Sequence, residues 1–594
     1  MGCRLLLASL FLIAVAGGCG GSGDAEPAVD HATQGEPFEV TLDRAVVEPN
    51  PFDPRQVQID GEFLSPRGQR FTIPAFVWQA FERALVGGFE RLTPASELQW
   101  KVRFTPTESG TWRWRWRLHS LQGSNSSEWR DLEVAPAPVF HGFVRPSPRD
   151  TRYLEFDDGN AFVPIGENMC WYDGRGTFAY EEWISRLAAH GGNFIRIWMP
   201  SWAFGLEWIE RGADGAVVHS SLGNYTRRLD RAWQLDSVVE LARRHGIQIM
   251  LSIQNHGPFS LTNNSEWADC PYNAANGGPL THPSELFTKP EAIRLFKQRL
   301  RYIVGRWGYA TNIMTWELWN EVDLVDQPGS DALVSWHREM AAELRSLDPY
   351  ARMISTSTSL SDVLAPSATF SALWALDTID YTQAHYYSFG VPTDFTRVFP
   401  AIFRRLARYQ KPVFISEAGV DFRGPAETIE QDPNADGFHD LLWAALFSGT
   451  LGIGMTWWWD NVVHPLDLYF HFRPLATLVR GVDFPGEGFR IRSESAVAPD
   501  GRPLQAFLLV GRSTVLAWVR NARHHYAAPD PAEIRDARLR LADPANGRWS
   551  AQWIDTRTAT IVREDALEAT SNGVEFTVPS FARDIALRMR LAEP

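Results

Sequence analysis

The sequence predicts a mixed α/β protein in which a (β/α)8 TIM barrel is flanked by an N-terminal and a C-terminal β-sandwich domain. Three observations support this prediction. Residues 150–489 alternate short apolar runs with amphipathic helical stretches. The segments before and after them show the two-residue alternation of half-buried strands. A chain of 594 residues also has room for about three domains.

Residues 1–18 have the pattern of a secretory signal peptide. Arg4 precedes the apolar run 5–16, which is too short for a permanent membrane-spanning helix. The sequence Ala16-Gly17-Gly18-Cys19 resembles the cleavage motif of bacterial lipoproteins, and a glycine-rich stretch follows it. We therefore expect lipid on Cys19, a flexible tether over residues 19–35, and an exported protein anchored to the bacterial cell envelope. A plain signal peptide with an incidental cysteine is the alternative.

Residues 36–140 predict an immunoglobulin-like β-sandwich. Trp112, Trp114 and Trp116 alternate with arginines, as expected of a strand with one buried and one exposed face. An aromatic stripe of period two is more typical of a core than of a sugar-binding platform. Proline-rich segments at 135–138 and 145–148 mark the connection to the next domain.

Eight predicted strands alternate with helices over residues 150–489. The strands are expected at 161–168, 194–199, 247–255, 313–320, 353–357, 381–387, 413–418 and 453–459. Helices are expected at 180–190, 229–245, 290–306, 333–347, 399–409 and 438–449. The fifth unit is the least regular, because residues 361–378 are only partly helical in pattern. Two-residue alternation returns in residues 490–594 and predicts a second β-sandwich, for which we expect a packing role.

Composition excludes several partners. The chain has 57 Lys and Arg against 71 Asp and Glu, so its net charge of -14 argues against nucleic acid. Its 25 Trp and 14 Tyr suit stacking on sugar rings, although Trp also fills cores. No motif for a metal, a nucleotide or a serine esterase is present in the sequence. We therefore expect no cofactor and no metal, membrane contact through the lipid anchor only, and a monomer.

Two cysteines, Cys170 and Cys270, remain after the predicted signal and lipidation site are set aside. Thiols in an oxidising compartment can pair, so a disulfide between them is one prediction. Two buried free thiols are the alternative.

Polar residues end the predicted strands, and barrel enzymes build their active sites on that face. Glu321 ends the fourth strand and Glu417 lies in the seventh, so the two carboxylates should meet across the barrel. Glycoside cleavage needs such a pair, one as acid and one as nucleophile. The other strand-end candidates for substrate contact are Arg196, Trp198, Asn255, His256, Asn320, His385, Tyr387 and Trp457.

Each of these side chains has an expected role. Arg196 and Tyr387 should keep Glu417 ionised, and His385 should orient the acid. Asn320 should bind a sugar hydroxyl, and Trp457 should form an aromatic floor. The third strand permits either Asn255 or His256 at the site, and Glu317 is expected to be a buried partner of Arg196.

Together, Asn320-Glu321, His385-x-Tyr387, Glu417 and Trp457 resemble the pattern of clan A retaining glycoside hydrolases, nearest to glycoside hydrolase family 5, which includes cellulases and mannanases. The resemblance covers roughly residues 152–489. It implies that Glu321 is the acid/base, that Glu417 is the nucleophile, and that the substrate is a β-linked carbohydrate.

The sequence thus predicts a retaining glycoside hydrolase acting on β-linked polysaccharide or oligosaccharide, with carboxyl groups about 5 Å apart. A non-catalytic carbohydrate-binding surface lipoprotein is one alternative, and the presence of both carboxylates argues against it. Transglycosylation would use the same residues and is the other alternative.

Overall fold

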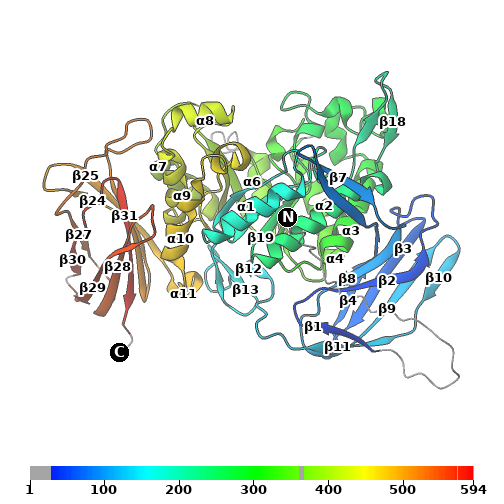
Figure 1. Cartoon of the computed structure of the whole chain (residues 1–594), viewed down its shortest axis with the longest axis horizontal. Helices are drawn as coiled ribbons and strands as arrows, with labels where there is room; N and C mark the ends of the chain where they lie inside the picture. The colour runs from blue at the N-terminus through cyan, green and yellow to red at the C-terminus, as the bar shows by residue number, and fades with distance from the viewer. Residues whose placement is uncertain are drawn as a thin grey trace, which may run out of the picture.

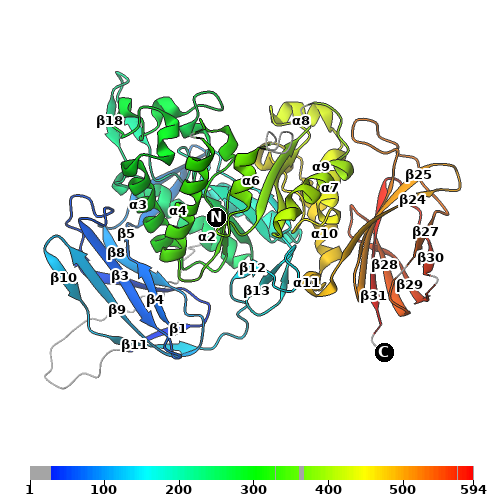
Figure 2. The same cartoon turned by 180° about the vertical axis from the view of Figure 1, so that it is seen from behind.

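The computed structural model describes residues 29–327, 329–359, 367–388, 390–542, 544–571 and 573–592. The predicted signal peptide and Cys19 lie outside these residues. Three parts follow one another along the long axis of the molecule: an N-terminal β domain, a central α/β domain and a C-terminal β domain (Figures 1 and 2). Across the described residues, no helix combines the length and the apolar character needed to cross a membrane.

The N-terminal domain contains two sheets and a separate hairpin. One sheet has the order β1-β11-β9-β3-β4, with β10 paired to β9, and the other has the order β2-β8-β5. Trp112 and Trp114 of β9 are buried, so the aromatic stripe belongs to the core as predicted. The strands are β1 (Asp30–Thr33), β2 (Phe38–Ala45), β3 (Val57–Leu64), β4 (Arg70–Pro74), β5 (Phe76–Trp78), β6 (Phe81–Val86), β7 (Phe89–Pro94), β8 (Gln99–Phe104), β9 (Gly110–Ser120), β10 (Gly123–Ser126) and β11 (Arg130–Ala135).

The central domain is built around parallel strands that follow the chain order. A five-stranded sheet has the order β15-β16-β19-β20-β21, and β22 pairs with β23. Thr456 bridges β23 at Ala418 and β15 at Glu167, which links the last parallel segment to the first. The strands are β15 (Gly166–Asn168), β16 (Phe194–Trp198), β19 (Gln248–Ser252), β20 (Ile313–Glu317), β21 (Met353–Ser355), β22 (Thr382–Tyr387) and β23 (Val413–Gly419).

Two of the predicted strands differ from the structure. Residues 161–168 are divided, because β14 (Ala161–Phe162) joins β12 (Val144–Pro146) and β13 (Leu154–Phe156) in an antiparallel sheet. Residues 453–459 pair through isolated bridges and form no ladder. Trp458 has a left-handed backbone with φ of 59°, and a π-helical turn begins at Trp459, so the extended conformation ends there.

Helices connect the parallel strands, and all six predicted helices are present. Pro290 begins α3, where the missing N–H of proline costs no hydrogen bond. Every residue of α9 is buried, because this helix lies between the central and C-terminal domains. The helices are α1 (Thr177–Ala189), α2 (Leu229–Arg244), α3 (Pro290–Trp307), α4 (Ser330–Leu347), α6 (Ala368–Trp374), α7 (Phe395–Leu406), α8 (Pro425–Gln431), α9 (Asp436–Phe447), α10 (Phe472–Val479) and α11 (Phe484–Glu487).

The C-terminal domain consists mainly of one antiparallel sheet with the order β24-β25-β26-β31-β28-β29. The second sheet contains only β27 and β30, so the two layers are very unequal. Trp553 of the large sheet contacts Phe576 of the small one, and a separate apolar core fills the space between them. The strands are β24 (Arg490–Val497), β25 (Pro503–Val510), β26 (Thr514–Asn521), β27 (Arg538–Leu541), β28 (Gly547–Ile554), β29 (Ile561–Ala569), β30 (Val574–Thr577) and β31 (Asp584–Leu591).

Candidate active site

The two predicted catalytic carboxylates lie next to each other at the carboxyl ends of the parallel strands. Glu321 follows β20, and Glu417 lies near the end of β23. One carboxylate oxygen of each residue and one ring nitrogen of His385 lie within 4.8 Å of one another. Two carboxyl groups that act on one glycosidic bond by double displacement are typically separated by roughly 5 Å, a similar distance.

Glu321 sits on a turn with an uncommon backbone conformation. Its φ of 52° is in the left-handed region, which residues with a side chain rarely adopt. The N–H of Glu321 donates to Ser357 Oγ at 3.0 Å, and a bridge between Asn255 and Asn320 fixes the preceding residue. These contacts with neighbouring strands hold the turn that carries the Glu321 carboxyl group.

Arg196 of β16 binds five side chains with one fully buried guanidinium group, of which Asn168 at 3.3 Å and Ser357 at 3.4 Å are the most distant. Its Nη1 is 2.6 Å from Glu417 Oε1, and its Nε and Nη2 each donate to Glu317 at 2.8 Å. Nη2 also donates to Asn320 Oδ1 at 2.7 Å. The expected partnership between Arg196 and Glu317 is present, and the arginine fixes the position of Glu417.

The second oxygen of Glu417 is also bound. Tyr387 Oη donates to Glu417 Oε2 at 2.7 Å. Burial raises the pKa of the Glu417 carboxyl group, and the contacts with His385, Arg196 and Tyr387 oppose this rise. The arginine and the tyrosine therefore favour the ionised form of Glu417, but they do not reverse the effect of burial.

Glu321 has contacts of a different kind. His385 Nδ1 lies 2.9 Å from Glu321 Oε1, and His256 Nδ1 lies 3.6 Å from Oε2. Burial lowers the pKa of His385 to about 4, so this imidazole is neutral near pH 7. Burial also raises the pKa of Glu321. A neutral imidazole stabilises a carboxylate much less than a guanidinium does, so Glu321 is the better proton carrier of the pair.

The structure separates the two candidates on the third strand. Asn320 Nδ2 donates to His256 Nδ1 at 3.3 Å, which places His256 beside the carboxylate pair. Asn255 Nδ2 instead donates to Glu266 Oε1 at 3.2 Å. His256 is therefore the third-strand residue that contacts the pair.

An aromatic cluster adjoins the Arg196 guanidinium, whose carbon lies 5.3 Å from the centroid of the Trp198 ring. The Trp457 ring is 5.3 Å from the Trp198 ring and 5.6 Å from the Trp171 ring, centroid to centroid. Trp198 is almost fully buried, so it supports Trp457 and has little surface left for substrate. Trp171 contacts Trp202, which is 44% exposed.

Sequence reasoning missed two residues of the site. Ser357 binds the Glu321 backbone, and Trp171 belongs to the aromatic cluster. Ser357 is the last residue of the predicted strand 353–357, so its strand-end position was an available signal, whereas Trp171 lies three positions beyond the predicted strand 161–168.

The predicted disulfide is wrong, because Cys170 and Cys270 are both free and buried. Cys170 Sγ lies 3.7 Å from Asn168 Oδ1 and 3.7 Å from the Arg196 carbonyl oxygen, beneath the site. Cys270 belongs to a separate loop, where its carbonyl accepts from Asn276 Nδ2 at 2.9 Å. The two thiols therefore have different neighbours.

By ligand type alone, Glu321, His385 and Glu417 could hold a metal ion. However, the Arg196 guanidinium already places a positive charge 2.6 Å from Glu417. A cation at the same carboxylate would be repelled by that charge. These residues are therefore better suited to acid and base chemistry.

Two kinds of sequence comparison find matches to this chain. Residues 32–119 match the model of a domain of unknown function, DUF5060. Mannan endo-1,4-beta-mannosidase 1 of Oryza sativa subsp. japonica is 28% identical over 222 residues, which are 35% of this chain and 47% of that protein. Mannan endo-1,4-beta-mannosidase 7 of Arabidopsis thaliana is 30% identical over 223 residues, again 35% of this chain and 47% of that protein.

The chain is similar to family 5 glycoside hydrolases. The resemblance predicted from the strand-end residues is therefore confirmed. The chain spans about half the length of the curated relatives it matches, 47% in both cases.

Solved structures show the same fold over a larger part of the chain. A Bacteroides vulgatus protein has a TM-score of 0.61 at 14% identity, covering 95% of this chain and 100% of that chain. A structure described as a glycoside hydrolase has a TM-score of 0.50 at 12% identity, covering 76% of this chain and 97% of that chain. At these identities the likeness concerns the fold, which is mixed α/β.

Proposed function

We propose that this protein is an O-glycosyl hydrolase that cleaves β-glycosidic bonds of a polysaccharide with retention of anomeric configuration. The observation that carries the proposal is the pair Glu321 and Glu417. Their nearest oxygens lie within 4.8 Å, and only Glu417 contacts the Arg196 guanidinium. Two neighbouring carboxyl groups with unequal surroundings are suited to one acid and one nucleophile.

In the first step, Glu417 attacks the anomeric carbon while Glu321 gives its proton to the departing glycosidic oxygen. The bond between sugar and leaving group breaks, and a covalent glycosyl ester forms on Glu417. Arg196 and Tyr387 hold both oxygens of Glu417 before the reaction, so little reorganisation is needed.

In the second step, the ionised Glu321 takes a proton from water, and the resulting hydroxide oxygen attacks the same carbon. The ester breaks and Glu417 returns to its ionised form. His385, which is neutral and 2.9 Å from Glu321, can accept a hydrogen bond from the protonated acid or donate one to the ionised base.

For the substrate, we propose a β-1,4-linked mannan, because the curated relatives are named mannan endo-1,4-beta-mannosidases. The catalytic domain of this proposal is a (β/α)8 barrel over residues 150–489, flanked by β-sandwich domains at 36–140 and 490–594. The order of the parallel strands and the link through Thr456 support the barrel.

The proposal is tested by incubating the purified protein with mannan, glucan, xylan and galactan and measuring new reducing ends. Proton NMR immediately after cleavage should show product of the same anomeric configuration as the substrate. Inverted product would contradict the retaining mechanism. Binding of a glycan without any cleavage would support the non-catalytic alternative instead.

We also propose that Cys19 is the lipid-bearing N-terminus of an exported protein. The support comes from the small residues before Cys19 and the glycine-rich stretch after it. The full chain should partition into membrane fractions, and a Cys19→Ala chain should not. Equal release of both chains by buffer alone would contradict the anchor.

A further inference from the structure

The hairpin of β6 and β7 carries an exposed apolar tip. The two strands pair only with each other and belong to neither sheet of the N-terminal domain. Leu85, Val86 and Phe89 at the tip are 50%, 58% and 57% exposed. Three neighbouring apolar side chains on a surface of this kind indicate a contact with another molecule or segment.

The hairpin lies over the central domain, next to α1 and α2 (Figure 1). Glu90 N donates to the Gly174 carbonyl at 3.0 Å, and Arg83 Nη1 donates to Thr177 Oγ1 at 2.8 Å. The Phe89 ring packs so closely on Gly174 that a Cβ there would be 2.8 Å from it. These contacts fix the tip on the loop between β15 and α1.

The same loop carries Trp171, which belongs to the aromatic cluster of the candidate active site. Two residues separate Trp171 from Gly174, so the chain between their Cα atoms spans at most about 11 Å. The Trp171 ring contacts Trp457 and the exposed Trp202. The loop that carries Trp171 also carries Gly174, on which Phe89 packs. Aromatic rings offer flat apolar faces on which sugar rings can stack.

We propose that the hairpin tip, formed by Leu85, Val86 and Phe89, binds glycan units that lie beyond the carboxylate pair. The occupant is the same β-linked chain that the proposed function assigns to the active site, and this inference rests on that function. The inference narrows the substrate class to polymers that are long enough to reach from Glu417 to the N-terminal domain.

Binding is tested in chains that carry Glu417→Ala, so that cleavage does not interfere. Electrophoresis through gels containing soluble β-mannan should retard the E417A chain. Adding Phe89→Ala should weaken retention by about tenfold, which corresponds to the loss of roughly one stacked ring. Leu121→Ser is the control, because Leu121 is an exposed apolar residue (78%) in a turn of the same domain.

The otherwise wild-type chain is tested by kinetics on the same mannan. Phe89→Ala should raise KM by about tenfold and shift the product sizes, with the change falling on KM rather than kcat. A Leu85→Ser, Val86→Ser double variant should act in the same direction. The reducing-end assay judges the proposed function separately from the hairpin.

Unchanged retention and unchanged KM in the hairpin variants, with an active wild type, would overturn the inference while leaving the proposed function intact. Loss of hydrolysis in the wild type alone would overturn the function, and gel retention would still decide the hairpin. Equal losses with Leu121→Ser would show a general effect on the N-terminal domain and would also overturn the inference.

Discussion

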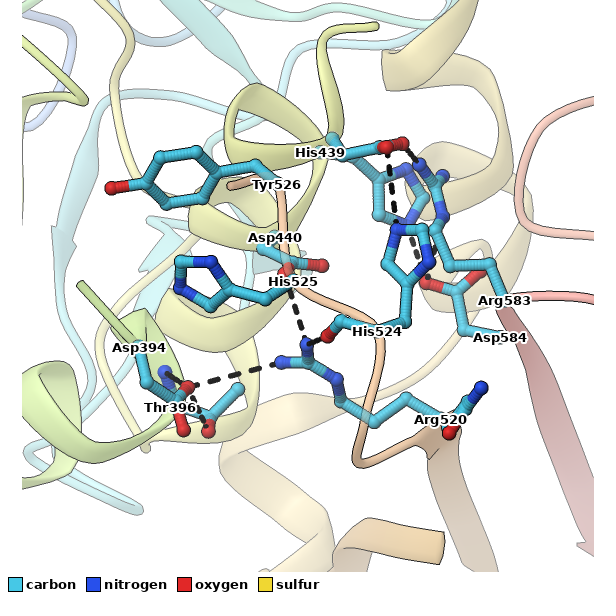
Figure 3. Close-up of polar contacts among 12 residues, drawn as sticks. Asp394, Thr396, His439, Asp440, Arg520, His524, His525, Tyr526, Arg583 and Asp584 are labelled. Atoms are coloured by element: carbon cyan, nitrogen blue, oxygen red, sulfur yellow. Dashed lines mark hydrogen bonds and ion pairs between the residues drawn. The ribbon is translucent and has the colours of Figure 1, made fainter. Parts of the chain in front are cut away.

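Two buried clusters in this protein combine histidine with carboxylates, and they differ in charge balance and access. One is the active-site group Glu321, His385 and Glu417. The other, which we call the junction cluster, is His439, Asp440 and Asp584 between the central and C-terminal domains (Figure 3). In each cluster, one ligand atom from every member lies within 4.8 Å of the others.

The junction cluster is closed, and its acids have cationic or hydrogen-bonding partners. His439 Nε2 lies 2.8 Å from Asp584 Oδ2, and Trp518 Nε1 donates to the same oxygen at 3.1 Å. Arg520 Nη2 donates to Asp440 Oδ2 at 3.1 Å (Figure 3). Burial alone would raise the pKa of Asp584, but His439 and Arg583 hold it well below its ordinary range.

The active-site cluster leaves its charge unbalanced. Glu317 and Glu417 share one guanidinium, Glu321 has no ion pair with it, and the pKa of Glu321 and that of Glu417 are both raised by burial. Glu321 also keeps 14% of its side chain exposed. Burial also raises the pKa of Asp440 in the junction cluster, so access rather than the direction of the pKa separates the two clusters: a buried acid gains chemistry when it can be reached, whereas a closed and paired acid holds domains together.

The largest expected effect is the loss of Glu417, the proposed nucleophile. Glu417→Ala should lower kcat on mannan by about 10⁴-fold or more, because no covalent intermediate can form. Initial rates and the unfolding temperature of the same preparation measure it. A variant with a lower unfolding temperature than the wild type, but with wild-type activity when folded, would contradict this role. Glu417 would then be a structural residue, like the acids of the junction cluster.

The acid should show a smaller loss that depends on the leaving group. Glu321→Ala should lower turnover of mannan by about 10²- to 10⁴-fold, and should spare aryl glycosides with acidic leaving groups, which need no protonation. Since burial raises the pKa of Glu321, the basic limb of the wild-type rate profile lies above the ordinary glutamate value.

Glu321→Gln should remove that basic limb. Rates across the pH range for both substrate types check the assignment. Equal losses on good and poor leaving groups would contradict the role of Glu321 as proton donor.

The junction acid should affect stability rather than chemistry. Asp584→Ala should reduce the free energy of unfolding by about 3–5 kcal/mol, because it removes the carboxylate that binds the buried His439 and leaves Arg583 with Asp436 as its ion-pair partner. Denaturant titration measures this loss. The milder Asp584→Asn serves if the alanine variant does not fold.

Asp500→Ala is the matched control, because Asp500 is an exposed partner of Arg502 in the same domain. It should change stability little. Equal losses of stability in Asp584→Ala and Asp500→Ala would contradict the stabilising role of the junction cluster.

The smallest expected effect concerns acid sensitivity. Burial lowers the pKa of His471, which contacts His439, well below its ordinary value of 6.5. The folded state therefore binds fewer protons than the unfolded state below that value, and the free energy of unfolding falls as the pH decreases from 6.5. His471→Gln should flatten this dependence by about 1.4 kcal/mol per pH unit.

Denaturant titrations between pH 7 and pH 5 test this slope. A His471→Gln protein whose stability follows the wild-type dependence would show that His471 titrates normally. His385 in the active site has its pKa lowered for the same reason, so the His471→Gln protein should keep part of the slope.

Local patterns were enough to predict the helices and the ends of most strands. Glu321, Glu417, Arg196 and Tyr387 could be placed because parallel strands in chain order bring their carboxyl ends together. The choice between His256 and Asn255 could not be made, since it depends on a bridge to Asn320 on another strand.

Other features depended on contacts that no local pattern contains. Trp198 lies at a strand end but is covered by Trp171 and Trp457. The two cysteines have a sequence separation suited to a disulfide, yet each thiol is enclosed by its own loop. The sequence of the hairpin of β6 and β7 has the pattern of two ordinary strands. Only the packing of Phe89 on Gly174 shows that the hairpin lies on the central domain.

The shared binding of Glu317, Asn320 and Glu417 by Arg196 also constrains which substitutions this protein can tolerate. Arg196→Lys would keep a charge but lose the planar fork that serves Glu317, Asn320 and Glu417 together. Glu317 has no exposed surface, so it would then need a simultaneous substitution to avoid an unpaired buried charge. The effect of a substitution at one of these positions therefore depends on the residues at the other positions. This part of the site can be altered only by paired substitutions, whether in evolution or by design.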